Sequence, residues 1–128
     1  MRAFRAAQEM IGARFRAQGD DPATGLDCAG LVWAAYARAG LRLAKPKDYP
    51  LRGWARSRIE ATLAMAGFEA ACGPARVGDV ILIVHAAQQY HLGLMGTDSF
   101  VHAHAGLRRV VETPCDAAVS AAARWRLS

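Results

Sequence analysis

The hydrophobic period of this chain changes halfway along its length, and that change constrains the fold more than any other feature. In the first half, apolar residues recur at helical spacing, which predicts three helices, at about 2–14, 28–39 and 54–66. In the second half, short β-branched runs lie between turn signals, which predicts strands at 80–84, 90–95, 100–104, 107–112 and 122–127. Helices followed by strands indicate an α+β fold, with helices packed on an antiparallel β-sheet, in place of a parallel βαβ fold.

The length and composition indicate one globular domain. The chain has 128 residues, of which 53% are hydrophobic and 21% charged, so we predict a single domain over 1–128. The run Val-Ile-Leu-Ile-Val at 80–84 predicts a strand buried on both faces, and 19–25 reads as a loop rich in helix breakers. The segment 1–16 interleaves arginines with apolar residues, so we expect no signal peptide and synthesis in the cytoplasm.

Cys28 is the cysteine whose position points most clearly to chemistry. It falls in the first turn of the second predicted helix, directly after Asp27, a good N-cap residue. The helix dipole and the free amide N–H groups there favour a thiolate, the nucleophilic form of cysteine. The alternative is a small buried side chain without chemistry. Cys72 and Cys115 lie in loop contexts, and three cysteines without a CxxC pair form neither a disulfide framework nor a zinc motif.

Three of the four histidines fall on neighbouring predicted strands. His91 lies on the second strand, whereas His102 and His104 lie two residues apart on the third and share a face. In a hairpin His91 therefore sits opposite or diagonal to one of them, and strand parity leaves both open. With Cys28 they would supply a nucleophile, a base and a group that orients the base. A zinc site built from the three histidines is an alternative that lacks the tight spacing of common zinc motifs.

The positive charge of the chain is carried mostly by arginine. The formal net charge is +5, with 16 Lys+Arg against 11 Asp+Glu, and Lys45 and Lys47 are the two lysines. The arginines are scattered and form no stripe interleaved with aromatic residues, so we predict no nucleic-acid partner. Arg108 and Arg109, after the third strand, are candidates to bind an anionic substrate, although a solvated turn is the simpler interpretation for at least one of them.

Four motifs resemble, in order, those of the NlpC/P60 cysteine peptidases. Residues 27–32 (DCAGLV) resemble the D-C-S-G-L-V motif that carries the nucleophile, and 76–81 (RVGDVI) resemble the P-G-D-L-V turn. Residues 91–94 (HLGL) resemble the H-V-G-I histidine strand, and 100–103 (FVHA) resemble the F-I-H-A segment with the third catalytic residue. One such motif is a weak signal, but four in this order extend the resemblance over nearly the whole chain.

The resemblance implies a papain-like α+β fold, in which the helix that carries the cysteine packs on the sheet that carries the histidines. It implies that Cys28 is the nucleophile, His91 the general base and His102 the residue that orients His91. It also implies hydrolysis of an amide bond in peptidoglycan stem peptides, between γ-D-glutamyl and a diamino acid, with no metal or organic cofactor. His104 has no counterpart in the core motifs and is a candidate on the substrate side.

The chain departs from the family pattern at three positions. Ala29 stands where the family usually has serine, and Val77 replaces the proline of the turn. Phe15 falls where many members have a tyrosine near the nucleophile. We therefore place Phe15 among the candidate substrate-binding residues, together with Asp27, which directly precedes Cys28. Without the tyrosine hydroxyl another donor must face the oxyanion, and the backbone N–H of Cys28, at the helix start, is a candidate.

Within the family, the sequence around residues 25–28 and 102–112 resembles that of the cell-wall peptidases of prophages and gene transfer agents. This subgroup implies a virion-associated enzyme that acts on the periplasmic cell wall, with phage tail proteins as further partners. A second hypothesis is a structural component of the virion tail tip whose hydrolase activity is auxiliary or lost. An acyl transferase acting on lipids shares the fold type, but no hydrophobic extension suggests a membrane partner.

Overall fold

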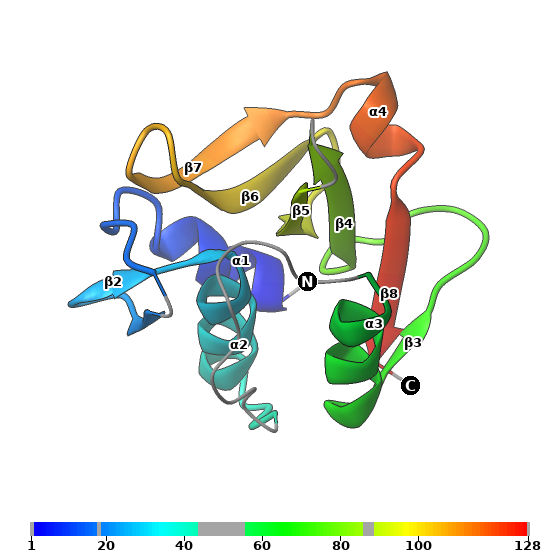
Figure 1. Ribbon diagram of the computed structural model, residues 1–128, viewed down its shortest axis with the longest axis horizontal. Helices are drawn as coiled ribbons and strands as arrows, with labels where there is room; N and C mark the ends of the chain where they lie inside the picture. The colour runs from blue at the N-terminus through cyan, green and yellow to red at the C-terminus, as the bar shows by residue number, and fades with distance from the viewer. Residues whose placement is uncertain (1, 18, 44–55, 86–88, 128) are drawn as a thin grey trace.

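The computed structural model describes residues 2–17, 19–43, 56–85 and 89–127, and Figure 1 shows its ribbon. The helices are α1 (Arg2–Glu9), α2 (Cys28–Arg38), α3 (Arg56–Met65) and α4 (Ala117–Ser120). The strands are β1 (Asp20–Asp21), β2 (Gly25–Leu26), β3 (Phe68–Ala70), β4 (Val80–His85), β5 (Gln89–Met95), β6 (Ser99–His104), β7 (Arg109–Pro114) and β8 (Ala123–Leu127). The predicted α+β fold is confirmed.

Six strands form one antiparallel sheet in the order β3-β8-β4-β5-β6-β7. The strands β4 to β7 follow one another as a meander, which agrees with the sequence prediction. The last strand, β8, returns to pair with β4, and β3 pairs with β8 at the edge of the sheet. The strands β1 and β2 form a separate hairpin inside the segment that was predicted as a loop.

The main core lies between the first two helices and the sheet. The helices α1 and α2 pack against each other, and α2 also packs on β5 and β6. Ala7 of α1 is fully buried, and this small side chain allows a close approach of the two helices. Leu31 and Val32 of α2 and Leu94 and Val101 of the sheet have no exposed surface. This packing sets α2 against the two strands that carry the predicted catalytic histidines.

The ends of the first two helices have local causes. Helix α2 begins at Cys28 because the carboxylate of Asp27 accepts a hydrogen bond from the backbone N–H of Gly30 at 2.7 Å, as its N-cap position predicted. Helix α1 ends at Glu9, well before its predicted end. Gly12 has a φ of 92°, a left-handed conformation that terminates helices, and the chain then runs extended beside β2 and β7.

Two predictions about the strands need correction. Strand β7 begins at Arg109, two residues later than predicted, because Arg108 belongs to the preceding turn and has a φ of 57°. Strand β4 is not buried on both faces to its end, since Val84 is 57% exposed. The described part of β8 pairs with β4 over 80–82 and leaves the end of β4 uncovered. The sequence pattern also missed β1, β2, β3 and α4, which are too short to show a hydrophobic period.

Part of the third predicted helix falls outside the described residues. Trp54, at its predicted start, is one such residue. Helix α3 ends at Met65, next to its predicted end, and contacts β3. None of the helices in the described ranges has the length and apolar character needed to cross a membrane.

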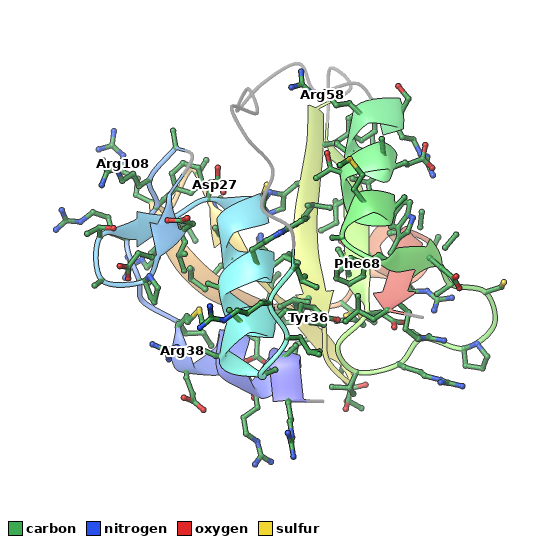
Figure 2. The ribbon with its side chains drawn as sticks, turned by 90° about the horizontal axis from the view of Figure 1, so that it is seen from below. Asp27, Tyr36, Arg38, Arg58, Phe68 and Arg108 are labelled. Carbon is green, nitrogen blue, oxygen red and sulfur yellow. The ribbon has the colours of Figure 1, made fainter. Side chains whose placement is uncertain are left out.

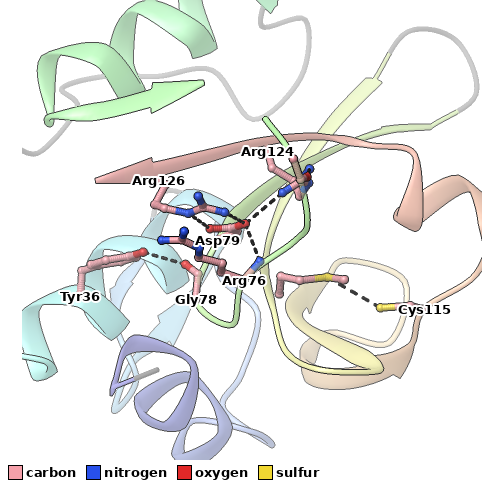
Figure 3. A network of polar contacts seen from close by, with 9 residues as sticks. Tyr36, Arg76, Gly78, Asp79, Cys115, Arg124 and Arg126 are labelled. Carbon is pink, nitrogen blue, oxygen red and sulfur yellow. Dashed lines mark hydrogen bonds and ion pairs between the residues drawn. The ribbon is translucent and has the colours of Figure 1, made fainter. Parts of the chain in front are cut away.

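A buried carboxylate ties β8 to the start of β4 (Figure 3). Asp79 is 1% exposed and accepts hydrogen bonds from Nε and Nη2 of Arg126 at 2.7 and 2.8 Å. Arg124 adds a contact at 3.2 Å, and the backbone N–H of Arg76 adds one at 2.9 Å. Burial raises the pKa of Asp79, but the hydrogen bonds from Arg126 and Arg76 outweigh it and hold the pKa below its usual value. The network fixes β8 against the start of β4.

Candidate active site

Cys28 lies against the strand that carries His91. It is the first residue of α2, and its side chain is partly exposed. The backbone N–H of Leu92 faces its sulfur and favours the ionised form, as does the backbone N–H of Ala29. Since Leu92 directly follows His91, the predicted nucleophile stands next to the point on β5 where the predicted base is attached.

The surroundings of Cys28 raise the pKa of its thiol to about 11. Burial has the largest effect; the N–H of Leu92 lowers the pKa, and the negative charge of Asp27 raises it again. The helix dipole alone predicted a thiolate, and this prediction is wrong for the resting site. The carboxylate that caps the helix offsets the positive helix end beside the thiol. The thiol therefore keeps its proton at neutral pH, and a reaction needs a base that removes it.

His91 and His102 form a hydrogen-bonded pair. Nε2 of His91 lies 2.8 Å from Nδ1 of His102, and the two ring planes are 79° apart. The other ring nitrogen of His102, Nε2, lies 2.8 Å from Oγ1 of Thr113 on β7. Phe100 stacks on the His102 ring with centroids 4.5 Å apart. His102 is buried, so contacts at both ring nitrogens and on one ring face fix its orientation.

The strand register explains which histidine meets His91, a question that strand parity left open. The described ladder between β5 and β6 pairs 94–95 with 100–101. If this register continued, His104 would lie opposite His91, but the ladder stops before that point and His91 reaches diagonally to His102. The His104 ring lies 5.6 Å from that of His102. In the described part of the chain, no group of three His, Cys, Asp or Glu residues is placed to hold a metal ion.

The predicted substrate-binding residues Phe15 and Arg108 lie together near the start of α2. Phe15 is half-buried, donates its backbone N–H to the carbonyl of Arg108 at 2.9 Å, and pairs with Leu26 of β2. Leu26 directly precedes Asp27, the N-cap residue of α2. Backbone pairing therefore connects Arg108 to the helix start through Phe15 and Leu26. Figure 2 shows Asp27 and the exposed Arg108 on the same side of the molecule and Arg38 toward the other end of α2.

The other two predicted substrate-binding residues have local structural contacts. The carboxylate of Asp27 is fully buried and caps α2, so a substrate does not reach it in this arrangement. His104 is half-buried, and its Nδ1 accepts a hydrogen bond from the backbone N–H of Leu107 at 3.0 Å. This bond holds the turn between β6 and β7. Asp27 therefore supports the start of α2, and a contact of His104 with substrate stays a prediction.

Gly30 lets the loop before α2 close on the helix. A Cβ at this position would lie 1.8 Å from the carbonyl oxygen of Gly19, far inside contact distance. The same carbonyl accepts a hydrogen bond from the backbone N–H of Asp27 at 3.2 Å. A glycine at this position therefore allows the loop to hold Asp27 and Cys28 in place, a role that the sequence analysis did not assign.

Thr113 and Asp79 were not among the residues that the sequence predicted for the site. The strand predicted at 107–112 stopped one residue before Thr113, and a threonine on a strand carries no signal of its own. The register would identify it, because Thr113 pairs with Phe100, on the same face of β6 as His102. Asp79 stood inside a recognised motif, but its arginine partners come from β8, far along the chain.

Comparisons with known proteins agree with this fold. The family profile described as NlpC/P60 family matches residues 12–124. Among solved structures, the NlpC/P60 domain of the peptidoglycan hydrolase SagA has a TM-score of 0.63 at 20% identity, over 96% of this chain and 95% of that one. The P60 domain of an antigen from M. avium subspecies paratuberculosis has a TM-score of 0.63 at 17% identity, over 98% and 92%.

A longer relative has the same fold in part of its chain. A protein similar to lipoprotein, of the NLP/P60 family from Staphylococcus aureus Mu50, has a TM-score of 0.66 at 18% identity. The match covers 99% of this chain and 41% of that one. No curated protein sequence matches this chain. Because the profile spans most of the chain and the solved domains share its fold, this chain belongs to the NlpC/P60 family.

Proposed function

We propose that this protein is a cysteine peptidase that hydrolyses an amide bond in the stem peptide of peptidoglycan. The observation that carries the proposal is the set of contacts around Cys28, whose sulfur lies at the backbone beside His91, while His91 is bonded to His102 and His102 to Thr113. Family membership supports it, and the similar domain of SagA is described as part of a peptidoglycan hydrolase.

The reaction begins with a proton transfer. Because Nε2 of His91 is bonded to His102, we assign Nδ1 as the atom that takes the proton from Sγ of Cys28. His91 then carries a positive charge, and its Nε2–H donates to Nδ1 of His102. His102 in turn donates from Nε2 to Oγ1 of Thr113. This chain holds the His91 ring in one orientation and one tautomer, which is the task of the third group in a catalytic triad.

The thiolate attacks the carbonyl carbon of the scissile amide, and the carbonyl oxygen becomes an oxyanion. The backbone N–H of Cys28 at the helix start is our candidate donor for that oxygen. When the C–N bond breaks, the proton on Nδ1 of His91 passes to the leaving nitrogen. Water, deprotonated by His91, then attacks the thioester, which releases the acid and restores the thiol.

Purified sacculi test this function. The wild-type protein should release soluble muropeptides, whereas Cys28→Ala and His91→Ala should release none above background. Cys72→Ala is the matched control, because Cys72 is an exposed cysteine outside the site and its loss should leave the release unchanged. Equal release by Cys28→Ala and wild type would overturn the proposal.

The same digest identifies the bond. We propose cleavage between γ-D-glutamyl and the diamino acid, so mass spectrometry should find products with a new free amine on the diamino acid. Release of products cut elsewhere in the stem peptide would contradict this assignment while leaving the peptidase function intact.

We also propose an association with phage-type particles, on the resemblance of residues 25–28 and 102–112 to that subgroup. Genes for tail proteins beside the gene for this chain would support it. Under the alternative, a tail-tip component with lost activity, purified protein would bind tail proteins and leave sacculi intact.

A further inference from the structure

Two arginines face each other at the edge of the site. Arg14 and Arg109 are partners in an antiparallel bridge. Around this pair, Phe15 donates its N–H to the carbonyl of Arg108, and Val110 donates to the carbonyl of Ala13, each at 2.9 Å. That pattern makes the arginines a non-hydrogen-bonded pair, in which opposite side chains approach most closely.

No acidic side chain compensates this pair within the described residues. The ion pairs there join Arg38, Arg56, Arg124 and Arg126 to carboxylates, and none includes Arg14, Arg16 or Arg109, which are all exposed. Like charges directly opposite each other on paired strands are destabilising. The turn beside them adds backbone strain, since Arg108 is a non-glycine residue with a φ of 57°. Both features disfavour folding without improving the packing.

These arginines lie beside the segment that leads into Cys28. Leu26 donates its N–H to the carbonyl of Arg14 at 2.8 Å and accepts a hydrogen bond from the N–H of Arg16 at 3.1 Å. Two residues further along the chain is Cys28. We name Arg14, Arg16 and Arg109 the arginine strip; it borders the nucleophile end of α2, the end at which Figure 2 shows Arg108.

The charge of the exposed side chains changes from positive to negative across β2. Asp20 and Asp21 form β1, which pairs with β2 on the side away from the arginine strip. Strands lie ~5 Å apart, so the acidic edge stands about 10 Å from the strip, comparable with the screening length at physiological salt. A long polyanion crossing the strip would meet this acidic edge. A short peptide that carries carboxylates and an amine matches both the positive arginine strip and the negative edge at β1.

We propose that the arginine strip binds free carboxylates of the peptide substrate and so selects acidic stem peptides. The inference rests on the proposed function for its substrate class. The guanidinium group suits this role because it forms paired hydrogen bonds with a carboxylate and stays charged at every accessible pH. The strip binds the peptide beside the scissile bond, on the side of β2 away from β1.

Binding to an inactive protein tests the strip without depending on cleavage. In a Cys28→Ala background, calorimetry would compare a γ-D-glutamyl-diamino acid peptide with free carboxylates and the same peptide with those carboxylates converted to amides. Arg14→Gln with Arg109→Gln should weaken binding of the acidic peptide at least tenfold and change binding of the amide peptide less than twofold. Arg14→Lys with Arg109→Lys should recover part of the loss because the positive charge remains. The recovery should be incomplete because lysine lacks the paired N–H donors of the guanidinium group.

A matched control removes the same charge elsewhere. Arg38→Gln with Arg42→Gln alters two exposed arginines at the other end of α2 and should leave both affinities unchanged. An equal loss in this control, or an equal loss for both peptides, would overturn the proposal. So would the absence of measurable binding by either peptide, or displacement of the acidic peptide by a poly(glycerol phosphate) chain or a single-stranded DNA at lower concentration. Normal binding with no cleavage by the wild type would instead refute the proposed peptidase function alone.

Discussion

Nε2 of His91 and Nδ1 of His102 lie 2.8 Å apart, and this contact determines how the pair can carry a proton. With Nε2 of His102 bonded to Thr113, the arrangement is a chain that starts at His91 and ends at a hydroxyl. A hydroxyl carries no charge, so this chain orients the imidazolium with less electrostatic stabilisation than a carboxylate in the third position would give.

Removing the second histidine should lower kcat and leave KM nearly unchanged, because His102 orients His91 and does not touch the substrate. For His102→Ala we expect a loss of about 10²-fold in kcat, at the low end of what a positioned general base contributes. Steady-state kinetics on a soluble stem peptide measures both constants. A loss confined to KM would contradict the positioning role.

The end of the chain can be tested separately. Thr113→Val removes one hydrogen bond to His102, worth about 1 kcal/mol, so kcat should fall about fivefold. Thr113→Ser keeps the hydroxyl and is the matched control, which should retain nearly full activity. If both variants behave alike, the hydroxyl of Thr113 has no part in orienting His102.

The raised pKa of Cys28 predicts slow alkylation at neutral pH. Burial raises the pKa of the thiol to about 11, so in His91→Ala the rate of reaction with iodoacetamide should increase about tenfold per pH unit up to that region. Cys72 is exposed and serves as the internal reference in the same mass spectrum. Faster alkylation of Cys28 than of Cys72 at pH 7 would contradict the protonated resting thiol.

Asp79→Asn should destabilise the protein by about 1–3 kcal/mol, because Arg124 and Arg126, which are partly exposed, lose the carboxylate that accepts their hydrogen bonds. In the unmodified protein the pKa of Asp79 is lowered by folding, so its ionised carboxylate stabilises the fold above the unfolded pKa of about 3.8. This stability is lost as the pH falls through the lower pKa of the folded protein. Chemical unfolding at pH 7 and acid titration measure the two effects. Asp98→Asn, an exposed carboxylate, is the control and should change the free energy of unfolding little.

The order of helices and strands, and the start of α2 at Cys28, could be predicted because hydrophobic period and N-capping are local signals. A local signal does not show where the hydrogen bonding between β5 and β6 ends, so the choice between His102 and His104 stayed open at the level of the sequence. Local signals also gave the wrong protonation state for Cys28, because burial and the charge of Asp27 depend on how α2 packs on β5. The Arg14–Arg109 bridge joins segments that no periodicity relates.

Arg14→Glu replaces a repulsive pair by an attractive one and separates stability from binding. Opposite charges on directly paired residues stabilise by roughly 0.2–1 kcal/mol, so the free energy of unfolding should rise by about this amount and the gain should shrink in high salt. The same variant should bind the acidic peptide more weakly, because the new carboxylate at position 14 then pairs with Arg109 and competes with the carboxylate of the substrate. Arg42→Glu, outside a described cross-strand pair, is the matched charge change and should show neither effect. If Arg14→Glu lowers stability instead, the two arginines do not repel each other in the folded protein, and the electrostatic basis of the arginine strip is wrong.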